Sequence, residues 1–160
     1  MNDVSIVLVA LICAALCLIN PGVAADKAAD FTLTNIEGQQ FSLSEHRGSV
    51  IILNFMSTRC RPCVKEISEL KVIHERYPDV LIISIETNPS CSDETLSAFK
   101  QRQGADWTFA VDKRGTLARQ YRVWAIPKIV IVDGDGFIRY APRPGATSAS
   151  AISQVIEKYA

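Results

Sequence analysis

Two cysteines separated by two residues, Cys60 and Cys63, are the side chains of this sequence best suited to chemistry. They follow an apolar run rich in β-branched residues, 50–56. Cys60 directly precedes, and Cys63 lies near the start of, a segment, 61–77, with apolar residues at helical spacing. The pattern predicts a buried strand whose end is followed by a two-cysteine motif that opens a helix. In that context the motif favours a redox pair over half of a zinc site.

The predicted helix start gives the two cysteines different roles. Free N–H groups and the positive end of the helix dipole favour an anion, so the pKa of Cys60 should fall below the roughly 8.5 of a free thiol. Cys60 is then the attacking nucleophile, and Cys63 resolves the mixed disulfide. Arg59 and Arg61 flank Cys60 and favour its thiolate. Pro62 falls in the first helical turn, where its missing N–H costs little.

A zinc site would need two more ligands than the motif supplies. The other candidates beyond the first twenty-five residues are Cys91, His46 and His74, which form no second pair. We therefore predict no metal and no other cofactor. Cys91 follows the predicted strand 80–85, and three interpretations stay open for it: an inert buried thiol, an intermolecular disulfide partner, or an additional redox residue.

The first twenty-five residues differ in composition from the rest. Residues 4–19 are apolar and uncharged, and they are followed by Asn20-Pro21-Gly22 and then Val23-Ala24-Ala25. This pattern is typical of a signal peptide with a small-residue cleavage site. The apolar run is shorter than the roughly twenty residues that span a bilayer. It is preceded by Asp3 and by no Lys or Arg, so a retained membrane anchor is the alternative.

This leader, 1–25, predicts a location outside the cytoplasm. The protein would be secreted or periplasmic, or anchored to the outer face of the cytoplasmic membrane by a tether through residues 4–19. The chain beyond Ala25 holds 17 basic and 16 acidic residues, without a basic patch of the kind that binds nucleic acid. Its length suits one domain, which we place at 28–160.

The order of predicted elements indicates an α/β fold. A short β-hairpin within residues 28–43 precedes strands joined by helices, and the chain closes with a hairpin and a terminal helix. We therefore expect a mixed central sheet with helices on both faces and an N-terminal β-hairpin. The predicted strands are 50–56, 80–85, 109–111, 128–132 and 137–140, and the predicted helices are 61–77, 94–102, 116–121 and 148–159.

Several short motifs occur together in an order that is specific. They are Phe31-Thr32-Leu33, Leu53-Asn54-Phe55, Cys60-Arg61-Pro62-Cys63, Glu66, Ala125-Ile126-Pro127 and Val132-Asp133-Gly134-Asp135-Gly136. With them the chain resembles the thioredoxin superfamily from about residue 28 to residue 159. It is most similar to the exported TlpA/ResA-like thiol-disulfide oxidoreductases, so a thioredoxin-like fold is expected.

The resemblance implies further site residues. In this family the proline matching Pro127 forms a cis peptide beside the cysteines, which leaves the backbone of Ile126 to pair with an extended substrate. A proline at a strand start is the simpler interpretation. Glu66 matches a glutamate that handles the proton of the resolving thiol, a role that Asn54, at the place of the thioredoxin buried acid, cannot fill. The alternative is a solvated helix residue. Arg59 replaces the family's usual tryptophan.

The function implied is thiol-disulfide exchange with protein cysteines, with a membrane electron donor or acceptor as partner and no bound cofactor. A peroxiredoxin-like peroxide reductase is an alternative, for which Ser57 fits the upstream hydroxyl but Leu53 stands at the expected proline. A second alternative is a non-catalytic thioredoxin-fold interaction module with a structural disulfide. A copper-binding assembly factor is disfavoured, because no histidine follows His74.

Overall fold

A computed structural model describes residues 26–160 of the chain. The predicted leader, 1–25, and the tether proposed within it lie outside the described residues. Across the described part, none of the helices combines the length and the apolar character needed to cross a membrane.

The described chain is built on one five-stranded sheet with the strand order β5-β4-β3-β6-β7. β3 and β4, and β4 and β5, pair in parallel, whereas β3 with β6 and β6 with β7 pair antiparallel. The strands are β3 (Ile51–Met56), β4 (Leu81–Glu86), β5 (Thr108–Val111), β6 (Lys128–Val132) and β7 (Ile138–Tyr140).

Helices link the parallel strands and close the chain. α2 (Arg61–Arg76) joins β3 to β4, and α3 (Asp93–Gln103) joins β4 to β5, as parallel pairing requires. The short α4 (Thr116–Gln120) follows β5, and α5 (Ala149–Tyr159) ends the fold. Side chains of Ser92 and Ser148 cap α3 and α5 by accepting main-chain N–H groups.

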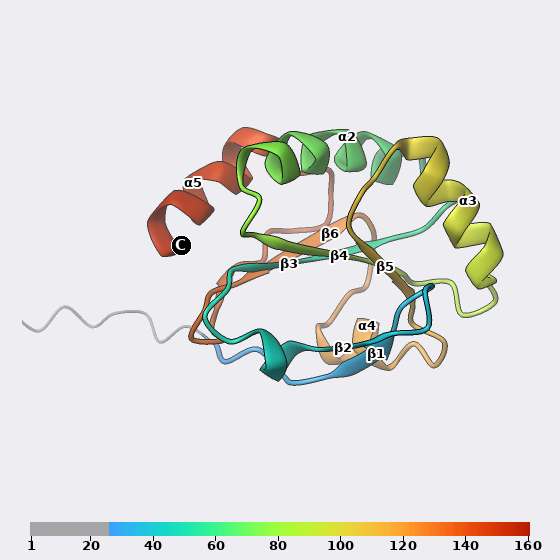
Figure 1. Cartoon of the computed structure of the whole chain (residues 1–160), viewed down its shortest axis with the longest axis horizontal. Coiled ribbons are helices and arrows are strands. Elements are labelled where there is room, and N and C mark those ends of the chain that lie inside the picture. The colour runs from blue at the N-terminus through green and yellow to red at the C-terminus, as the bar shows by residue number, and fades with distance from the viewer. Residues whose placement is uncertain (1–25) are drawn as a thin grey trace, which may run out of the picture.

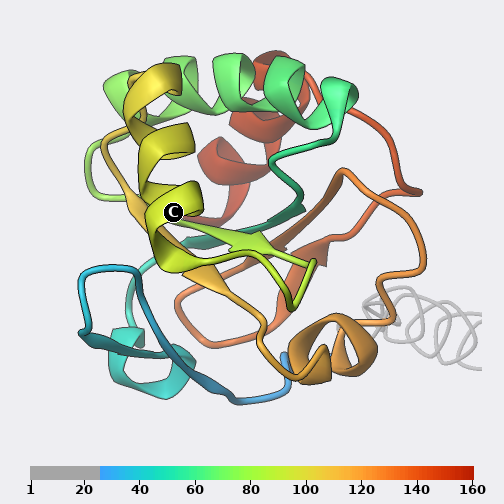
Figure 2. The same ribbon diagram turned by 90° about the vertical axis from the view of Figure 1, so that its right-hand side faces the viewer.

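Three layers result, with the sheet in the middle (Figure 1). α2, α3 and α5 cover one face, and α4 lies on the other with a separate hairpin and a 3-10 turn. Figure 2 shows the same layers from the side at which α2 begins. The hairpin consists of β1 (Thr32–Thr34) and β2 (Gln40–Ser42), and the 3-10 turn is η1 (Leu43–His46). The predicted mixed sheet, helices on both faces and N-terminal hairpin are therefore confirmed.

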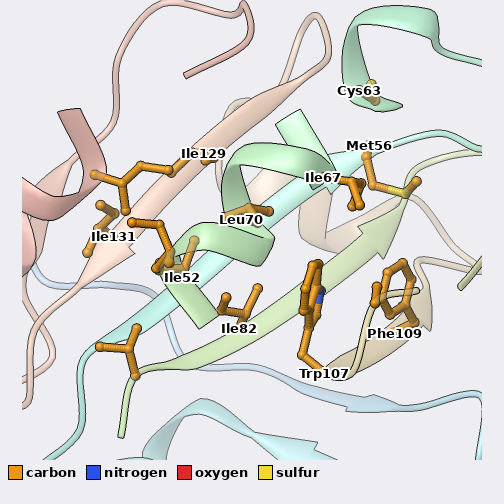
Figure 3. Close-up of a cluster of buried hydrophobic side chains, with 14 of the residues drawn as sticks. Ile52, Met56, Cys63, Ile67, Leu70, Ile82, Trp107, Phe109, Ile129 and Ile131 are labelled. Atoms are coloured by element: carbon orange, nitrogen blue, oxygen red, sulfur yellow. The ribbon is translucent and has the colours of Figure 1, made fainter. Parts of the chain in front are cut away.

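Strand β3 divides the core into two clusters because its side chains alternate between the faces. Ile52 and Met56 belong to the cluster beneath α2, α3 and α5, which Figure 3 shows. Ile51, Leu53 and Phe55 belong to the cluster beneath the hairpin and α4. All six residues of β3 are buried, as expected of a central strand covered on both sides.

One edge of the sheet collects the segments that matter for chemistry. Phe55, near the end of β3, pairs with Lys128 at the start of β6, and Met56 pairs with Glu86 at the end of β4. The loop that leaves β3 and carries the cysteines therefore emerges beside the loop that enters β6. It also emerges beside the loop that follows β4.

A small polar network lies inside the cluster beneath α2. Asn54 Nδ2 donates to Ser84 Oγ at 3.0 Å, and Trp107 Nε1 donates to the same oxygen, also at 3.0 Å. Asn54 and Ser84 are fully buried. Ser84 therefore satisfies two buried donors, and its position in β4 links β3 to Trp107, the residue before β5.

Replacing Ser84 by alanine should destabilise the fold strongly. Two buried N–H donors would lose their acceptor, so we expect the free energy of unfolding to fall by about 2–4 kcal/mol. Urea denaturation measures the loss. The matched control is Ser153→Ala, at a buried serine of α5 whose side chain accepts and donates no hydrogen bond within residues 26–160; we expect little change there. Equal stability of both variants would contradict the network.

Candidate active site

The two cysteines of the motif form a disulfide at the start of α2. Their Cα atoms are 5.2 Å apart. Cys60 is the N-cap residue, and its Sγ accepts the main-chain N–H of Cys63 at 3.2 Å. Pro62 lies in the first turn, where it removes a donor that the helix does not need. The predicted placement of the motif at a helix start is confirmed.

The two sulfurs differ in access to solvent. Cys60 is half-buried, whereas Cys63 is fully buried. Arg59, Arg61 and Pro62 are exposed around Cys60. An incoming group therefore meets Cys60 first.

A buried carboxylate holds the loop between β3 and the disulfide. Glu86 Oε2 accepts the N–H of Thr58 at 2.6 Å, and its Oε1 accepts the N–H of Asn88 at 2.9 Å. Thr87 Oγ1 also donates to the carbonyl of Met56 at 3.2 Å. The predicted strand 80–85 ended one residue too early: Glu86 ends β4 and is fully buried. An acid directly after a buried strand was the available signal.

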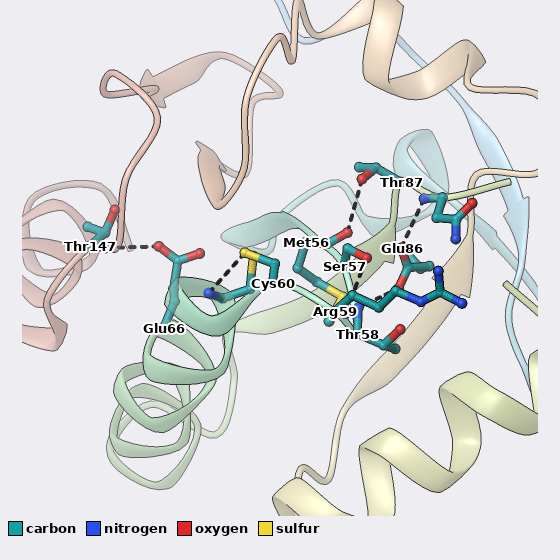
Figure 4. Close-up of a disulfide and its surroundings, with 11 residues drawn as sticks. Met56, Ser57, Thr58, Arg59, Cys60, Glu66, Glu86, Thr87 and Thr147 are labelled. Atoms are coloured by element: carbon teal, nitrogen blue, oxygen red, sulfur yellow. Dashed lines mark hydrogen bonds between the residues drawn. A yellow bond between two sulfur atoms is a disulfide. The ribbon is translucent and has the colours of Figure 1, made fainter. Parts of the chain in front are cut away.

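Glu66 lies one helical turn beyond Cys63 and is fully buried (Figure 4). Its Oε1 accepts the N–H of Thr147 at 2.8 Å, and its Oε2 has no partner within the described chain. Burial raises the pKa of Glu66 to about 7, although the hydrogen bonds from Thr147 oppose the shift. The interpretation of Glu66 as a solvated helix residue is therefore wrong.

A second glutamate of α2 joins Glu66 in holding the segment before α5. Glu69 Oε2 accepts the N–H of Ala149 at 2.8 Å. The two acceptors thus fix residues 147–149 against α2. Thr147 and Ala149 were missed by the sequence reasoning, because main-chain donors some 80 residues away leave no trace in a local pattern.

Pro127 reaches the same edge of the sheet from β6. The Ile126–Pro127 peptide bond is cis, as predicted. Pro127 is buried, and its carbonyl accepts the N–H of Gly145 at 2.9 Å. Ile126 is partly buried and packs against both core clusters, one of which also contacts Cys60.

Cys91 lies in a separate environment beside the loop of Thr58 and Arg59. It is 7% exposed and forms no disulfide within residues 26–160. Burial, together with the nearby charge of Glu86, raises the pKa of its thiol. A cavity of about 360 Å³ adjoins both Arg59 and Cys91. These properties favour the inert interpretation of Cys91 among the three.

Another hollow lies away from the disulfide. A cavity of about 390 Å³ lies between β1 and α4, and neither cysteine of the motif lines it. Across residues 26–160, no three His, Cys, Asp or Glu side chains gather in a way that could hold a metal ion.

Comparison with known sequences gives a consistent set of relatives. The model of the AhpC/TSA family matches residues 24–141. The thiol-disulfide oxidoreductase ResA of Bacillus thuringiensis subsp. konkukian is 27% identical over 110 residues, covering 69% of this chain and 64% of ResA. The thioredoxin-like protein YneN of Bacillus subtilis is 30% identical over 115 residues, covering 71% of this chain and 67% of YneN. The chain thus spans less than two thirds of the ResA protein.

Solved structures support the same grouping. A DsbE-type thiol:disulfide interchange protein from Chlorobium tepidum superposes with a TM-score of 0.74 at 25% identity, covering 84% of this chain and 95% of that one. A thioredoxin-like protein from Aeropyrum pernix superposes with a TM-score of 0.70 at 27% identity, covering 81% and 89%. The thioredoxin-like fold expected from the sequence is therefore confirmed.

The raised pKa of Glu66 makes a prediction for stability. The folded state binds this proton more tightly than the unfolded chain does, so the stabilisation is complete below the usual carboxyl pKa and is lost as pH rises through about 7. Between about pH 4 and about pH 8, the wild type should lose about 3 kcal/mol of unfolding free energy relative to Glu66→Gln. Urea denaturation across this range measures the difference. Parallel pH profiles would contradict the assignment.

Proposed function

We propose that this chain, which belongs to the AhpC/TSA family, is a thiol-disulfide oxidoreductase acting on protein cysteines. The half-exposed Cys60, which caps α2, supports the proposal. The observation that carries the proposal is the difference in access between the two sulfurs. The similarity to ResA, which is named as a thiol-disulfide oxidoreductase, also supports it.

The first step is attack by the Cys60 thiolate on a substrate disulfide. Its electron pair forms a new sulfur–sulfur bond, and the substrate disulfide breaks, releasing one substrate thiolate that takes up a proton. The N–H of Cys63, which points at Cys60 Sγ at 3.2 Å, and the helix dipole stabilise the attacking anion. Exposed Arg59 and Arg61 add positive charge.

The second step frees the substrate. Cys63 loses its proton and attacks Cys60 Sγ, so the mixed disulfide breaks, the second substrate thiolate leaves and the Cys60–Cys63 disulfide forms. The substrate has gained two electrons and the enzyme has lost two. Glu66 accepts the proton of Cys63 through the free Oε2, since its pKa of about 7 lets it exist in both forms near neutral pH. Run backwards, the same steps oxidise a dithiol.

Substrate binding is assigned to residues around the exposed sulfur. Ile126 and Pro127 would offer the main chain that pairs with an extended substrate segment. Arg59, Arg61 and Pro62, which adjoin Cys60 in the chain, are exposed and would contact the substrate beside the sulfur. The domain proposed for this activity is 28–160.

The proposed location is outside the cytoplasm. The apolar leader supports export, either as a cleaved signal peptide or as a tether through residues 4–19. A membrane protein that donates or accepts electrons would then return the Cys60–Cys63 pair to its working state. Immunoblotting of cell fractions with an antibody to this protein tests the placement. The protein should occur in the extracytoplasmic or membrane fraction, and finding it in the cytoplasmic fraction alone would contradict the proposal.

The cysteine assignment predicts opposite behaviour for two variants. Cys63→Ser should accumulate a mixed disulfide at Cys60, because the resolving thiol is gone. Cys60→Ser should abolish insulin reduction, because no exposed nucleophile remains. Mass spectrometry of the trapped adduct and an insulin turbidity assay measure the two effects, and Cys91→Ser serves as the matched control with activity near wild type.

Three results would contradict the proposal in whole or in part. Near wild-type insulin reduction by Cys60→Ser would overturn the assignment of the nucleophile. Rapid consumption of hydrogen peroxide without reduction of protein disulfides would favour the peroxide reductase. An unreactive pair whose thiol pKa values stay near about 8.5 would favour the structural disulfide of an interaction module.

The role of Glu66 predicts a change in thiol acidity. An ionised Glu66 disfavours a second negative charge nearby, so Glu66→Gln should lower the pKa of Cys63 by roughly one unit. Ultraviolet absorbance of the thiolates in the reduced protein follows the titration. Glu69→Gln removes a carboxylate one turn further along and should leave the titration unchanged. Superimposable curves for wild type and Glu66→Gln would exclude Glu66 from proton handling.

A further inference from the structure

Charge is distributed unevenly along this nearly neutral chain. Three segments, 57–65, 121–128 and 140–148, together hold six of the 17 basic residues and none of the 17 acidic ones. The six are Arg59, Arg61, Lys65, Arg122, Lys128 and Arg143. The first acid beyond these segments is Glu66, which is fully buried.

Hydrogen bonds bring the three segments to one edge of the sheet. The loop from β3 emerges beside the start of β6, because Phe55 pairs with Lys128. The third segment is tied to both neighbours: Gly145 N–H donates to the carbonyl of Pro127, Lys128 Nζ donates to the carbonyl of Pro142, and Thr147 N–H donates to Glu66. These segments lie together on the right-hand side of Figure 2.

Five of these cations, the four arginines and Lys65, are exposed, and none of the five forms an ion pair within residues 26–160. Arg59, Arg61, Arg122 and Arg143 are exposed, and we call them the arginine rim. The four ion pairs formed among residues 26–160 involve Arg76, Lys100, Lys113 and Arg139 instead. Asp93, an acid near the Arg59 cavity, already pairs with Lys113 at 3.0 Å. The positive charge of the rim is therefore available to a partner.

An exposed aromatic side chain accompanies the rim. Trp124 is 77% exposed, and Val72 is the other large apolar side chain exposed in the described chain. Trp124 lies two residues before Ile126 and two after Arg122, whose φ of 53° turns the chain between α4 and this loop. Tryptophan and arginine are the residue types enriched where proteins bind one another most strongly.

We propose that the arginine rim and Trp124 dock an acidic polypeptide segment that carries the reacting cysteine of the substrate. The proposal rests on the thiol-disulfide exchange proposed above and names its substrate class. Opposite charges would steer the segment to the rim and hold it there. Trp124 would cover an apolar side chain next to the reacting cysteine.

A protein partner fits this surface better than a membrane or a nucleic acid. The cations surround a redox sulfur, and the occupant of that surface must present a sulfur to Cys60. Lipid headgroups and nucleic acids carry none. The rest of residues 26–160 holds 11 basic and 16 acidic residues, so positive charge is concentrated at the place of reaction.

The test compares peptides that differ only in charge. Three peptides of equal length carry one cysteine in a disulfide with a chromogenic aryl thiol, flanked by Glu, Gln or Lys. The reduced full-length chain, in neutral detergent, attacks each peptide and releases the coloured thiol. Each rate is divided by the rate with dithiothreitol, which removes intrinsic reactivity. We expect kcat/KM about tenfold higher for the acidic than for the basic peptide at low ionic strength.

Salt and substitutions locate the effect. Raising the salt from about 10 mM to about 500 mM shortens the Debye length several-fold, so the preference should shrink towards unity. Arg122→Asn combined with Arg143→Gln should reduce the acidic-to-basic ratio severalfold. The matched control, Lys27→Gln combined with Arg102→Gln, removes the same charge from exposed sites and should keep the ratio. Lys27 pairs with Phe137 just before β7, and Arg102 lies in the last turn of α3 before β5, so both precede strands that end or begin away from Cys60. Trp124→Ser should lower kcat/KM about tenfold for all three peptides.

The outcomes separate this inference from the function beneath it. Reaction with the neutral peptide but no charge preference overturns the docking inference and leaves the exchange activity standing. An equal loss of preference in the control variant also overturns it, because net charge would then suffice. If none of the peptides reacts, both proposals fail. Rim-dependent binding to phosphatidylglycerol vesicles without a peptide preference would assign the surface to a membrane.

Discussion

The pairing of β3 with both of its neighbours is the constraint on which the rest of the structure depends. Its parallel register with β4 and antiparallel register with β6 bring three chain segments to one edge of the sheet. The disulfide, the buried Glu86 and the cis Ile126–Pro127 bond meet there because of that register. A one-residue slip would reverse the faces of β3 and place Asn54 beneath the hairpin instead of α2.

The site combines rigid supports with one accessible atom. Glu86 holds the loop before Cys60, and α2 holds Cys63 and Glu66 in the buried layer beneath α5. Cys60 alone of the pair reaches solvent. Burial does two things here: it shields Cys63 from solvent, and it raises the pKa of Glu66 to about 7.

Polar groups buried around the site act mainly on the backbone. Glu66, Glu69 and Glu86 each accept main-chain N–H groups. Such contacts position loops that have little apolar surface of their own to bury. They also join distant parts of the chain, because α2, which carries Cys63, holds the segment before α5 through Glu66 and Glu69.

The sequence by itself determined the fold class and the reactive pair. Apolar periodicity identified nearly every strand and helix, and the cysteine spacing at a strand–helix junction identified the redox motif, since both signals are local. Tertiary structure alone decided that Glu66 is buried and bound by Thr147, that Glu86 supports the loop, and that distant arginines share one rim. Those relations join residues far apart in the chain, and only the register of the sheet and the packing of α5 bring them into contact.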